Sequence, residues 1–403
     1  MLSASKYQNL LFEQASTLGI SSLSEQEITT SFSNYQAIVA AIETSDDSSI
    51  SFAEFVDLAL YQPLYGYYVS GKEVLGDAGD FITAPEISPL FGYALLESIK
   101  TTLKQSAGHI YEFGGGSGKL AKAILEYAHN SNIPIESYNI IEVSPALIDT
   151  QKNTLATIND ITNQPVEINW CEQLPDEIDG CVIANEVLDA IACHRVKKHN
   201  STILENRIVL EQGILTSTWL PPRSPEVIEW LSNHHDKLDW QDNNIVEIAP
   251  WRSAWLKTVS DKLRHGAMVF IDYGYSADQF FHQQRVAGTV KCFIRQTSND
   301  HYLSLLGLQD ITSHVNFSEL SLAAEQAGLT LTGFTEQGQW IIESGVLNFK
   351  MSDSLVERTE QAYAIQQLTM PQNMGEIVKV IAFSRQLPDN AQPKISSRLV
   401  SRL

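Results

Sequence analysis

Residues 111–120 read YEFGGGSGKL, and they constrain the fold more than any other stretch of the chain. The apolar run HIYEF at 109–113 precedes the glycines, and LAKAILEYA at 120–128 follows them with helical spacing. A strand, a glycine turn and a helix in this order form the first half of a βαβ unit. In open α/β sheets ligands bind beyond the carboxyl ends of the strands, so this turn is a candidate binding site.

The glycine run departs from two common nucleotide-binding motifs. A phosphate-binding P-loop needs Gly at Phe113 and a hydroxyl residue at Leu120. The dinucleotide fingerprint G-x-G-x-x-G needs a glycine where Lys119 stands. The run instead fits E-x-G-x-G-x-G, the form seen in class I S-adenosylmethionine (SAM) methyltransferases.

The residue types in this motif suit the amino-acid end of SAM. Gly114, Gly116 and Gly118 allow close approach of the backbone, and N–H groups at a helix start can face a carboxylate. Glu112 could face the ammonium group, directly or through water. Glycine loops also occur as plain tight turns, so other parts of the chain are needed to distinguish a cofactor site from a turn.

Further apolar runs alternate with helical patterns and predict an α/β, doubly wound, Rossmann-like sheet. An antiparallel meander is expected at 195–220, with turns near Asn200 and Gly213, inserted into this α/β frame. PALIDTQKNTLATI is an expected helix. The expected strands are SYNIIEV (137–143), VEINW (166–170), GCVIANEV (180–187), AMVFIDYG (267–274), LTLTGFTEQGQWII (329–342) and EIVKVIAFSR (376–385).

Polar residues at the ends of the second and third strands are candidate cofactor ligands. Glu142, at the tip of the second strand, is placed to accept both ribose hydroxyls, although an acid at a helix N-terminus is the alternative. Trp170 and Cys171 end the third strand, near where class I enzymes contact the adenine. Trp170 is equally compatible with a core tryptophan.

The fourth strand ends in Asn185, Glu186 and, shortly after, Asp189. Polar side chains directly after a buried strand are costly unless they have a partner. A helix cap accounts for Asn185 but leaves Glu186 unexplained. The fifth strand ends in Asp272 and Tyr273, another polar tip on the same edge.

The composition indicates which binding partners and which cellular compartment to expect. The chain has 403 residues and a formal net charge of −21, which disfavours nucleic-acid or anionic membrane partners. Its four cysteines show no zinc or redox spacing and suit a reducing compartment. No apolar run approaches a membrane span, and the first twenty residues match neither a secretory nor a mitochondrial signal. A cytoplasmic protein without metal is expected.

Six short blocks, in consistent order over about residues 50 to 350, resemble the MidA-like family, the relatives of the mitochondrial complex I assembly arginine methyltransferase. The first and last blocks are more specific than the glycine run. They are GDFITAPEISPLFG (79–92), EFGGGSGKLA (112–121), NIIEVSPAL (139–147), VIANEVLDA (182–190), VFIDYGY (269–275) and GLQDITSHVNF (307–317).

This resemblance implies a class I methyltransferase fold, SAM as methyl donor and protein arginine side chains as acceptors, a respiratory-complex subunit being one candidate. It also implies that the GDFITAPE segment covers the SAM site, which places Asp80, Thr83, Pro85 and Ser88 near the cofactor. The chain departs from the family pattern at Ala192, where a proline is usual, and at Gln296, where a histidine is usual. The second departure puts the role of that side chain in doubt.

The expected organisation has two parts. Residues 1–105 form an N-terminal helical region and the cofactor-covering segment, and residues 106–403 form the methyltransferase core. The core carries an insertion at about 194–245 and elaborations at about 280–325 and 345–375.

If the acceptor is an arginine, the polar residues near the end of the fourth strand have expected roles. A guanidinium is always protonated, and a carboxylate can grip it while one nitrogen stays free to attack. Glu186 is the first candidate for this grip and Asp189 the second, while Asn185 would orient the acceptor or the methionine end of SAM. His314 is the candidate proton acceptor, although a lone histidine is more often structural.

Two alternatives stay open at this point. A SAM-binding assembly chaperone without catalysis would keep the same glycine loop. An NAD-dependent oxidoreductase would normally show the G-x-G-x-x-G fingerprint, which is absent. The oligomeric state, the acceptor and the number of methyl groups transferred are not encoded in these patterns.

Overall fold

The computed structural model describes residues 1–71, 80, 82–160, 165–200, 202–234, 241–349 and 354–403. These residues form two compact units, each assembled from three separate segments. The first unit comprises 1–81, 189–251 and 281–314, and the second comprises 82–188, 252–280 and 315–403. Gly79 and Phe81 of the GDFITAPE segment lie outside the described residues.

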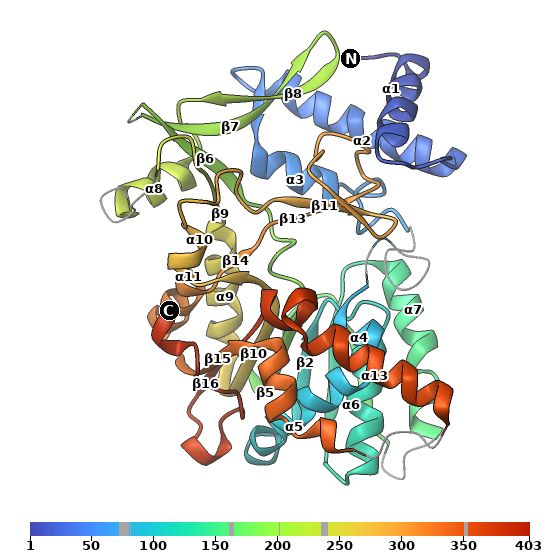
Figure 1. Cartoon of the computed structure of the whole chain (residues 1–403), viewed down its shortest axis with the longest axis vertical. Helices are drawn as coiled ribbons and strands as arrows, with labels where there is room; N and C mark the ends of the chain where they lie inside the picture. The colour runs from blue at the N-terminus through green and yellow to red at the C-terminus, as the bar shows by residue number, and fades with distance from the viewer. Residues whose placement is uncertain (72–79, 81, 161–164, 201, 235–240, 350–353) are drawn as a thin grey trace. The chain divides into compact units, whose positions relative to one another are not determined.

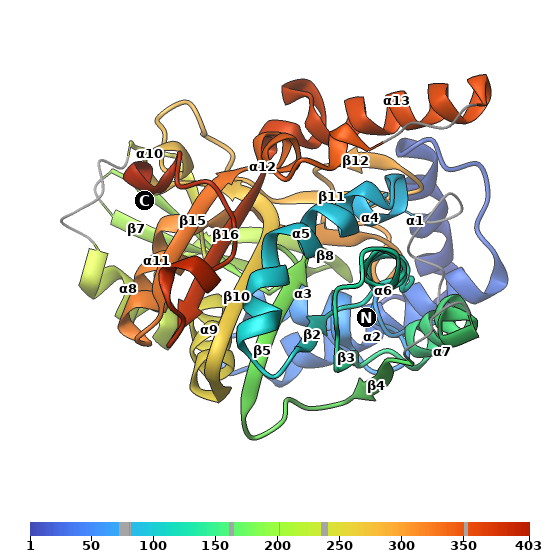
Figure 2. The ribbon, with the colours of Figure 1, turned by 90° about the horizontal axis from the view of Figure 1, so that it is seen from below.

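The second unit is built on one large sheet with the strand order β15-β16-β10-β5-β2-β3-β4, which can be followed across Figure 2. The short strand β14 (Val315–Asn316) adds to β10. The strands are β2 (His109–Phe113), β3 (Ser137–Ile141), β4 (Glu167–Cys171), β5 (Ile178–Asn185), β10 (Leu263–Tyr275), β15 (Thr330–Glu336) and β16 (Val378–Arg385).

Five neighbouring strands of this sheet, from β10 to β4, run parallel. Strand β16 runs antiparallel between β10 and β15. The predicted α/β sheet is confirmed, because strands that are buried on both faces appear in the sequence as short continuous apolar runs.

Helices cover both faces of this sheet. On β10, Val269 and Ile271 join a core with helices α5 and α6, whereas Phe270 between them lies 5.5 Å from the ring of Trp255 in α9. Adjacent strand residues point to opposite faces, so the sheet is doubly wound. The helices of this unit include α4 (Ala84–Ile87), α5 (Leu90–Gln105), α6 (Lys119–Asn130), α7 (Pro145–Leu155), α10 (Ala277–Phe280), α11 (Phe317–Gln326), α12 (Gln337–Glu343) and α13 (Leu355–Thr369), and α9 (Pro250–Lys262) begins two residues before the unit does.

The strand expected over 329–342 is correct only in its first half. It ends at Glu336, and residues 337–343 form helix α12. Within α12, Trp340 donates from Nε1 to Ser98 Oγ over 2.8 Å, and a side chain at Gly338 would collide with the carbonyl oxygen of Thr369 at 2.3 Å. Tertiary packing therefore favours a helix at residues 337–343, although the apolar pattern alone indicated a strand.

The first unit combines N-terminal helices with an antiparallel sheet (Figure 1). Its sheet has the order β1-β7-β6-β9, and β8 pairs with β7. The predicted meander is confirmed: Asn200 and Gly213 at its turns have φ values of 47° and 85°. The elements are α1 (Ala4–Thr17), α2 (Glu25–Thr44), β1 (Ser49–Ser51), α3 (Phe52–Tyr61), β6 (His194–His199), β7 (Thr202–Glu211), β8 (Ile214–Leu220), α8 (Pro225–His234) and β9 (Ile245–Ile248), with a small sheet of β11 (Lys291–Ile294), β12 (Thr297–Asn299) and β13 (Asp310–Thr312).

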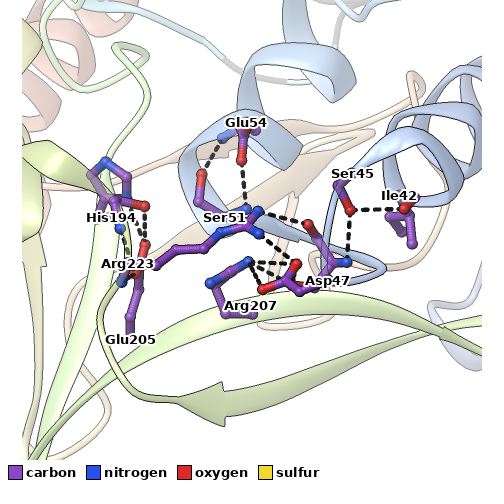
Figure 3. Close-up of polar contacts among 11 residues, drawn as sticks. Ile42, Ser45, Asp47, Ser51, Glu54, His194, Glu205, Arg207 and Arg223 are labelled. Carbon is purple, nitrogen blue, oxygen red and sulfur yellow. Dashed lines mark hydrogen bonds and ion pairs between the residues drawn. The ribbon is translucent and has the colours of Figure 1, made fainter.

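A polar cluster joins the meander to the end of α2 (Figure 3). The buried Arg207 donates from Nη2 to both carboxylate oxygens of Asp47, at 3.2 and 3.0 Å. Arg223 contacts the same carboxylate at 2.5 Å. Burial alone would raise the pKa of Glu205. Hydrogen bonds from His194 and Ser224 outweigh burial and lower this pKa to about 2. These contacts give Arg207 and Glu205 of the meander a structural role.

None of the helices in the described part of the chain has the length and apolar character needed to cross a lipid bilayer.

Candidate active site

The glycine loop connects β2 to α6 at the carboxyl edge of the large sheet. Gly114, Gly116 and Gly118 all have left-handed backbones, with φ values of 62°, 54° and 84°. The register places Phe113 beside Ala184 of β5, so the loop begins level with the tip of β5. At Gly118 a Cβ would lie 3.2 Å from Gln151 Cα, so a side chain there would be strained by the backbone and crowded by α7.

Glu142 directly follows β3 and is almost completely buried. Its Oε1 accepts hydrogen bonds from the N–H groups of Val143 and Ser144, at 2.9 and 3.0 Å. Its Oε2 accepts from Gln151 Nε2 at 3.1 Å. Burial raises the pKa of Glu142, and these hydrogen bonds oppose the shift. The carboxylate is therefore held in one orientation at the tip of the strand.

Glu112 lies in β2, one residue before the end of that strand, and is 2% exposed. It accepts a hydrogen bond from the Tyr138 hydroxyl over 2.8 Å. Burial raises the pKa of Glu112 to about 7, with a lowering contribution from Tyr138 and a raising one from Glu142. A carboxyl group with this pKa can gain or lose a proton near neutrality.

Trp170 and Cys171 end β4, as expected. Trp170 is partly buried, and its Nε1 donates to Gln151 Oε1 over 3.0 Å, while Lys152 Nζ lies 5.6 Å from the ring centroid. Burial raises the pKa of the Cys171 thiol, so it stays protonated at neutral pH.

A non-glycine residue with a left-handed backbone directly follows β5. Glu186 has a φ of 52°, a left-handed conformation that costs a non-glycine residue on the order of 1 kcal/mol. Its N–H donates to the carbonyl oxygen of Ile271 over 2.8 Å. Asn185 donates from Nδ2 to Glu186 Oε1 over 3.3 Å, and its buried Oδ1 has no hydrogen-bond partner among the described residues. An orphaned acceptor beside a strained residue is typical of a ligand site.

Asp272 supports this tip from β10. Its Oδ2 accepts from the N–H groups of Val187 and Leu188, at 3.2 and 2.8 Å, and its Oδ1 accepts from Tyr273 N–H at 2.8 Å. Its carboxylate fixes the turn that follows Glu186, a structural use that the sequence did not reveal.

Helix α4, which contains Pro85 and is flanked by Thr83 and Ser88, lies against the glycine loop. Glu86 makes this contact: it pairs with Lys119 Nζ at 2.6 Å and accepts a hydrogen bond from Ser117 Oγ. Glu86 was not among the expected site residues, although it lies inside the block GDFITAPEISPLFG. The ion pair with Glu86 gives Lys119 a structural role, in place of the phosphate contact that the lysine of a P-loop makes.

Three predicted residues belong to the first unit: Asp80, Asp189 and His314. Asp80 accepts from the Tyr67 hydroxyl at 3.0 Å and from Arg295 N–H at 2.8 Å. The backbone carbonyl of Asp189 accepts from Ser313 N–H at 3.0 Å, one residue before His314.

The first unit also contains a buried carboxyl group that was not among the expected site residues. Asp310 accepts from the Tyr68 hydroxyl over 3.0 Å. Burial and, next, the charge of Asp189 raise the pKa of Asp310 to about 8. Its position inside the block GLQDITSHVNF was the only available signal.

A model of the family of S-adenosyl-L-methionine-dependent methyltransferases matches residues 90–335. The chain belongs to this family. A crystal structure of a Burkholderia thailandensis protein bound to S-adenosyl-homocysteine (SAH) has a TM-score of 0.85 and 30% identity with this methyltransferase, over 94% of this chain and 97% of that one. The match confirms the predicted fold, and SAM is the cofactor.

Curated relatives agree with this family. The mitochondrial protein arginine methyltransferase NDUFAF7 of Homo sapiens is 26% identical to this methyltransferase over 363 residues, which cover 81% of this chain and 78% of the human one. Its counterpart in Danio rerio is 26% identical over 362 residues, covering 81% of both chains. Family membership favours the methyltransferase over the oxidoreductase alternative.

The residues at the carboxyl edge fit a ligand such as SAM. At Gly115 a Cβ would meet Ile140 Cγ2 at 2.8 Å, so the loop lies tight against the strand beneath it and can present its backbone outward. Glu112, Glu142 and Asn185 supply the acceptors that an ammonium group and a ribose need.

Proposed function

We propose that this methyltransferase transfers a methyl group from SAM to an arginine side chain of a protein, and that its cofactor lies over the glycine loop. In this placement Glu142 accepts from the ribose hydroxyls, Glu112 faces the ammonium group and Trp170 with Cys171 flanks the adenine. Thr83, Pro85 and Ser88 border the same site, because Glu86 joins their helix to the loop.

The observation that carries the proposal is the tip of β5. Bound SAM supplies an electrophilic methyl group on a sulfonium. The protein must then hold a protonated guanidinium, and a carboxylate does so with paired hydrogen bonds. Glu186 is proposed for this role, because its carboxylate accepts a hydrogen bond from Asn185 Nδ2, on the same amide as the orphaned oxygen of Asn185. That oxygen would accept from the guanidinium or from the methionine end of the cofactor.

Three further residues have proposed roles that rest on the sequence. Asp189 is the second candidate for gripping the guanidinium, and His314 is the candidate acceptor of the proton that the methylated nitrogen loses. Asp80 is assigned to the cofactor neighbourhood through the family resemblance. Support for a role of Asp189 is its position three residues after Glu186 in the block VIANEVLDA, and His314 lies in the block GLQDITSHVNF.

The proposed acceptor is a basic protein segment, and a respiratory-complex subunit is the first to test. The names of the curated relatives support an arginine acceptor. The net charge of −21 supports it independently, since an acidic protein attracts a basic segment. A cytoplasmic location is part of the same proposal. It is supported by the four free cysteines and is testable by cell fractionation.

The decisive experiment separates cofactor binding from transfer. The Glu186→Gln variant should bind SAH within about twofold of wild type in calorimetry, because a neutral amide of equal size leaves the glycine loop unchanged. Transfer of radiolabelled methyl from SAM to arginine-bearing peptides should fall about 100-fold, the loss expected when one electrostatic contact to the reacting group is removed.

The control is Glu177→Gln, an exposed acid at the opposite end of β5 that pairs with Arg264 at 3.5 Å. It should leave binding and transfer unchanged. Full transfer by Glu186→Gln would remove that residue from the reaction. SAH binding by the wild type without transfer to any arginine acceptor would instead favour a cofactor-binding assembly factor.

A further inference from the structure

A buried side-chain amide next to the glycine loop joins three parts of the proposed cofactor site. Gln151 lies in α7 and has no exposed surface. Its Nε2 donates to the carbonyl oxygen of Gly116 over 3.0 Å and to Glu142 Oε2 over 3.1 Å. Its Oε1 accepts from Trp170 Nε1 over 3.0 Å. One residue therefore touches the loop, the tip of β3 and the end of β4.

The chemistry of the three partners fixes how this amide is oriented. A carbonyl oxygen and a carboxylate only accept hydrogen bonds, and an indole N–H only donates. A flipped amide would face two acceptors with its oxygen and a donor with its NH₂ group, and would satisfy none of them. The Gln151 amide thus has one orientation, and its three partners are held relative to one another.

The contact matters most for Glu142. The backbone N–H groups of Val143 and Ser144 hold one oxygen of that carboxylate, and Gln151 holds the other. Both oxygens together set the plane of the carboxylate. Two ribose hydroxyls need a carboxylate in a defined plane, so the orientation that Gln151 sets bears directly on cofactor affinity.

We propose that Gln151 is a positioning residue for SAM. It holds the Glu142 carboxylate against the ribose and the Trp170 indole against the adenine, and it does not touch the reacting atoms. The proposal rests on the cofactor placement described under Proposed function, and it is independent of the methyl acceptor.

The test measures SAH affinity by calorimetry on the full chain. Gln151→Met keeps the length of the side chain and removes all three hydrogen bonds, so SAH should bind about tenfold more weakly. Gln151→Glu places a second carboxylate against Glu142 and should weaken binding further, to about 100-fold. In methyl-transfer assays the KM for SAM should rise with little change in kcat, because the acceptor end of the site is untouched.

The matched control is Asn153→Asp on the exposed side of the same helix, which adds the same charge as Gln151→Glu. It should bind SAH within twofold of wild type. A lower midpoint of thermal unfolding for Gln151→Met, with unchanged SAH affinity, would show a merely structural role and overturn the proposal.

A double-mutant cycle gives a second, independent readout. If Gln151 acts through Glu142, then Gln151→Met should have little further effect on SAH binding in a Glu142→Gln background. Fully additive losses would overturn that coupling. Wild-type SAH affinity in Glu142→Gln alone would overturn the cofactor placement and this proposal together. Normal SAH binding with no arginine methylation would count only against the proposed acceptor.

Discussion

Glu112 and Glu142 lie at the ends of neighbouring strands, and their surroundings give the two carboxyl groups different chemistry. Glu142 accepts three hydrogen bonds, two from backbone N–H groups and one from a side chain. Glu112 accepts one, from Tyr138, and is 2% exposed. Near pH 7 a fraction of Glu112 is therefore neutral, since burial raises its pKa to about 7.

This difference predicts that SAH binding releases protons. An ammonium group placed near Glu112 favours the carboxylate, so its pKa should fall from about 7 when the ligand binds. At pH 7 calorimetry in buffers of different ionisation enthalpy should then report proton release. Glu112→Gln should abolish the release.

Glu97→Gln is the matched control for this experiment. Glu97 also accepts from a tyrosine hydroxyl, Tyr127 at 2.8 Å, but it is partly exposed and pairs with Lys100. It should leave the proton release unchanged. Identical heats in all buffers for the wild type would place the ammonium group away from Glu112.

Among the elements, the glycine loop is held from several sides. Glu86 of α4 contacts Ser117 and Lys119, and Gln151 of α7 contacts Gly116. Thr154 of α7 adds a hydrogen bond from its hydroxyl to the carbonyl oxygen of Ser117 at 2.7 Å. A loop fixed in this way can bind a ligand without first being ordered, which lowers the entropic cost of binding.

Substitutions at two glycines with the same φ should lower the free energy of unfolding by different amounts. Gly118 and Gly345 both have a φ of 84° and both precede a helical turn. A Cβ at Gly118 meets Gln151 Cα at 3.2 Å, whereas nothing lies within 4 Å of a Cβ at Gly345. Gly345→Ala should cost about 1 kcal/mol of unfolding free energy through strain alone.

Gly118→Ala should cost more than this and should also weaken SAH binding. Denaturant unfolding and calorimetry on the two variants measure both effects. Equal losses of stability, with SAH affinity intact in both, would contradict a role for close packing of the loop against α7.

The same elements show what a sequence can predict. The strand, glycine loop and helix at 109–130 were predictable, because the apolar pattern, the turn and the helix are all local. Gln151 and Glu86 were not, because each acts on a loop more than thirty residues away in the sequence. Nothing near Gln151 distinguishes it from a surface glutamine until the helix is packed. The left-handed backbone of Glu186 was equally hidden, since left-handed residues are usually signalled by glycine or asparagine.

For the molecule as a whole, the buried carboxyl groups predict how stability depends on pH. Burial and the charge of Asp189 raise the pKa of Asp310 from 3.8 to about 8. The folded state then holds a proton that the unfolded state releases. This contribution is fully present below pH 4 and is lost as the pH rises through 8.

Asp310→Asn should therefore flatten the fall in the thermal unfolding midpoint between pH 5 and pH 8.5. Asp300→Asn, at an exposed acid that pairs with Lys291 at 2.6 Å, should follow the wild-type profile. A wild-type slope in Asp310→Asn would show that this carboxyl is already ionised at pH 5.

The position of β16 has a consequence for synthesis on the ribosome. This strand comprises residues 378–385, yet it lies between β10 and β15, and among the described residues it is the one strand that pairs with β15. All three segments of the first unit have emerged by residue 314, whereas the large sheet lacks an internal strand until residue 385 has left the exit tunnel. The nascent chain must therefore carry β10 with one open edge from the emergence of residue 275 to that of residue 385, and a chaperone that shields strand edges would act during that interval.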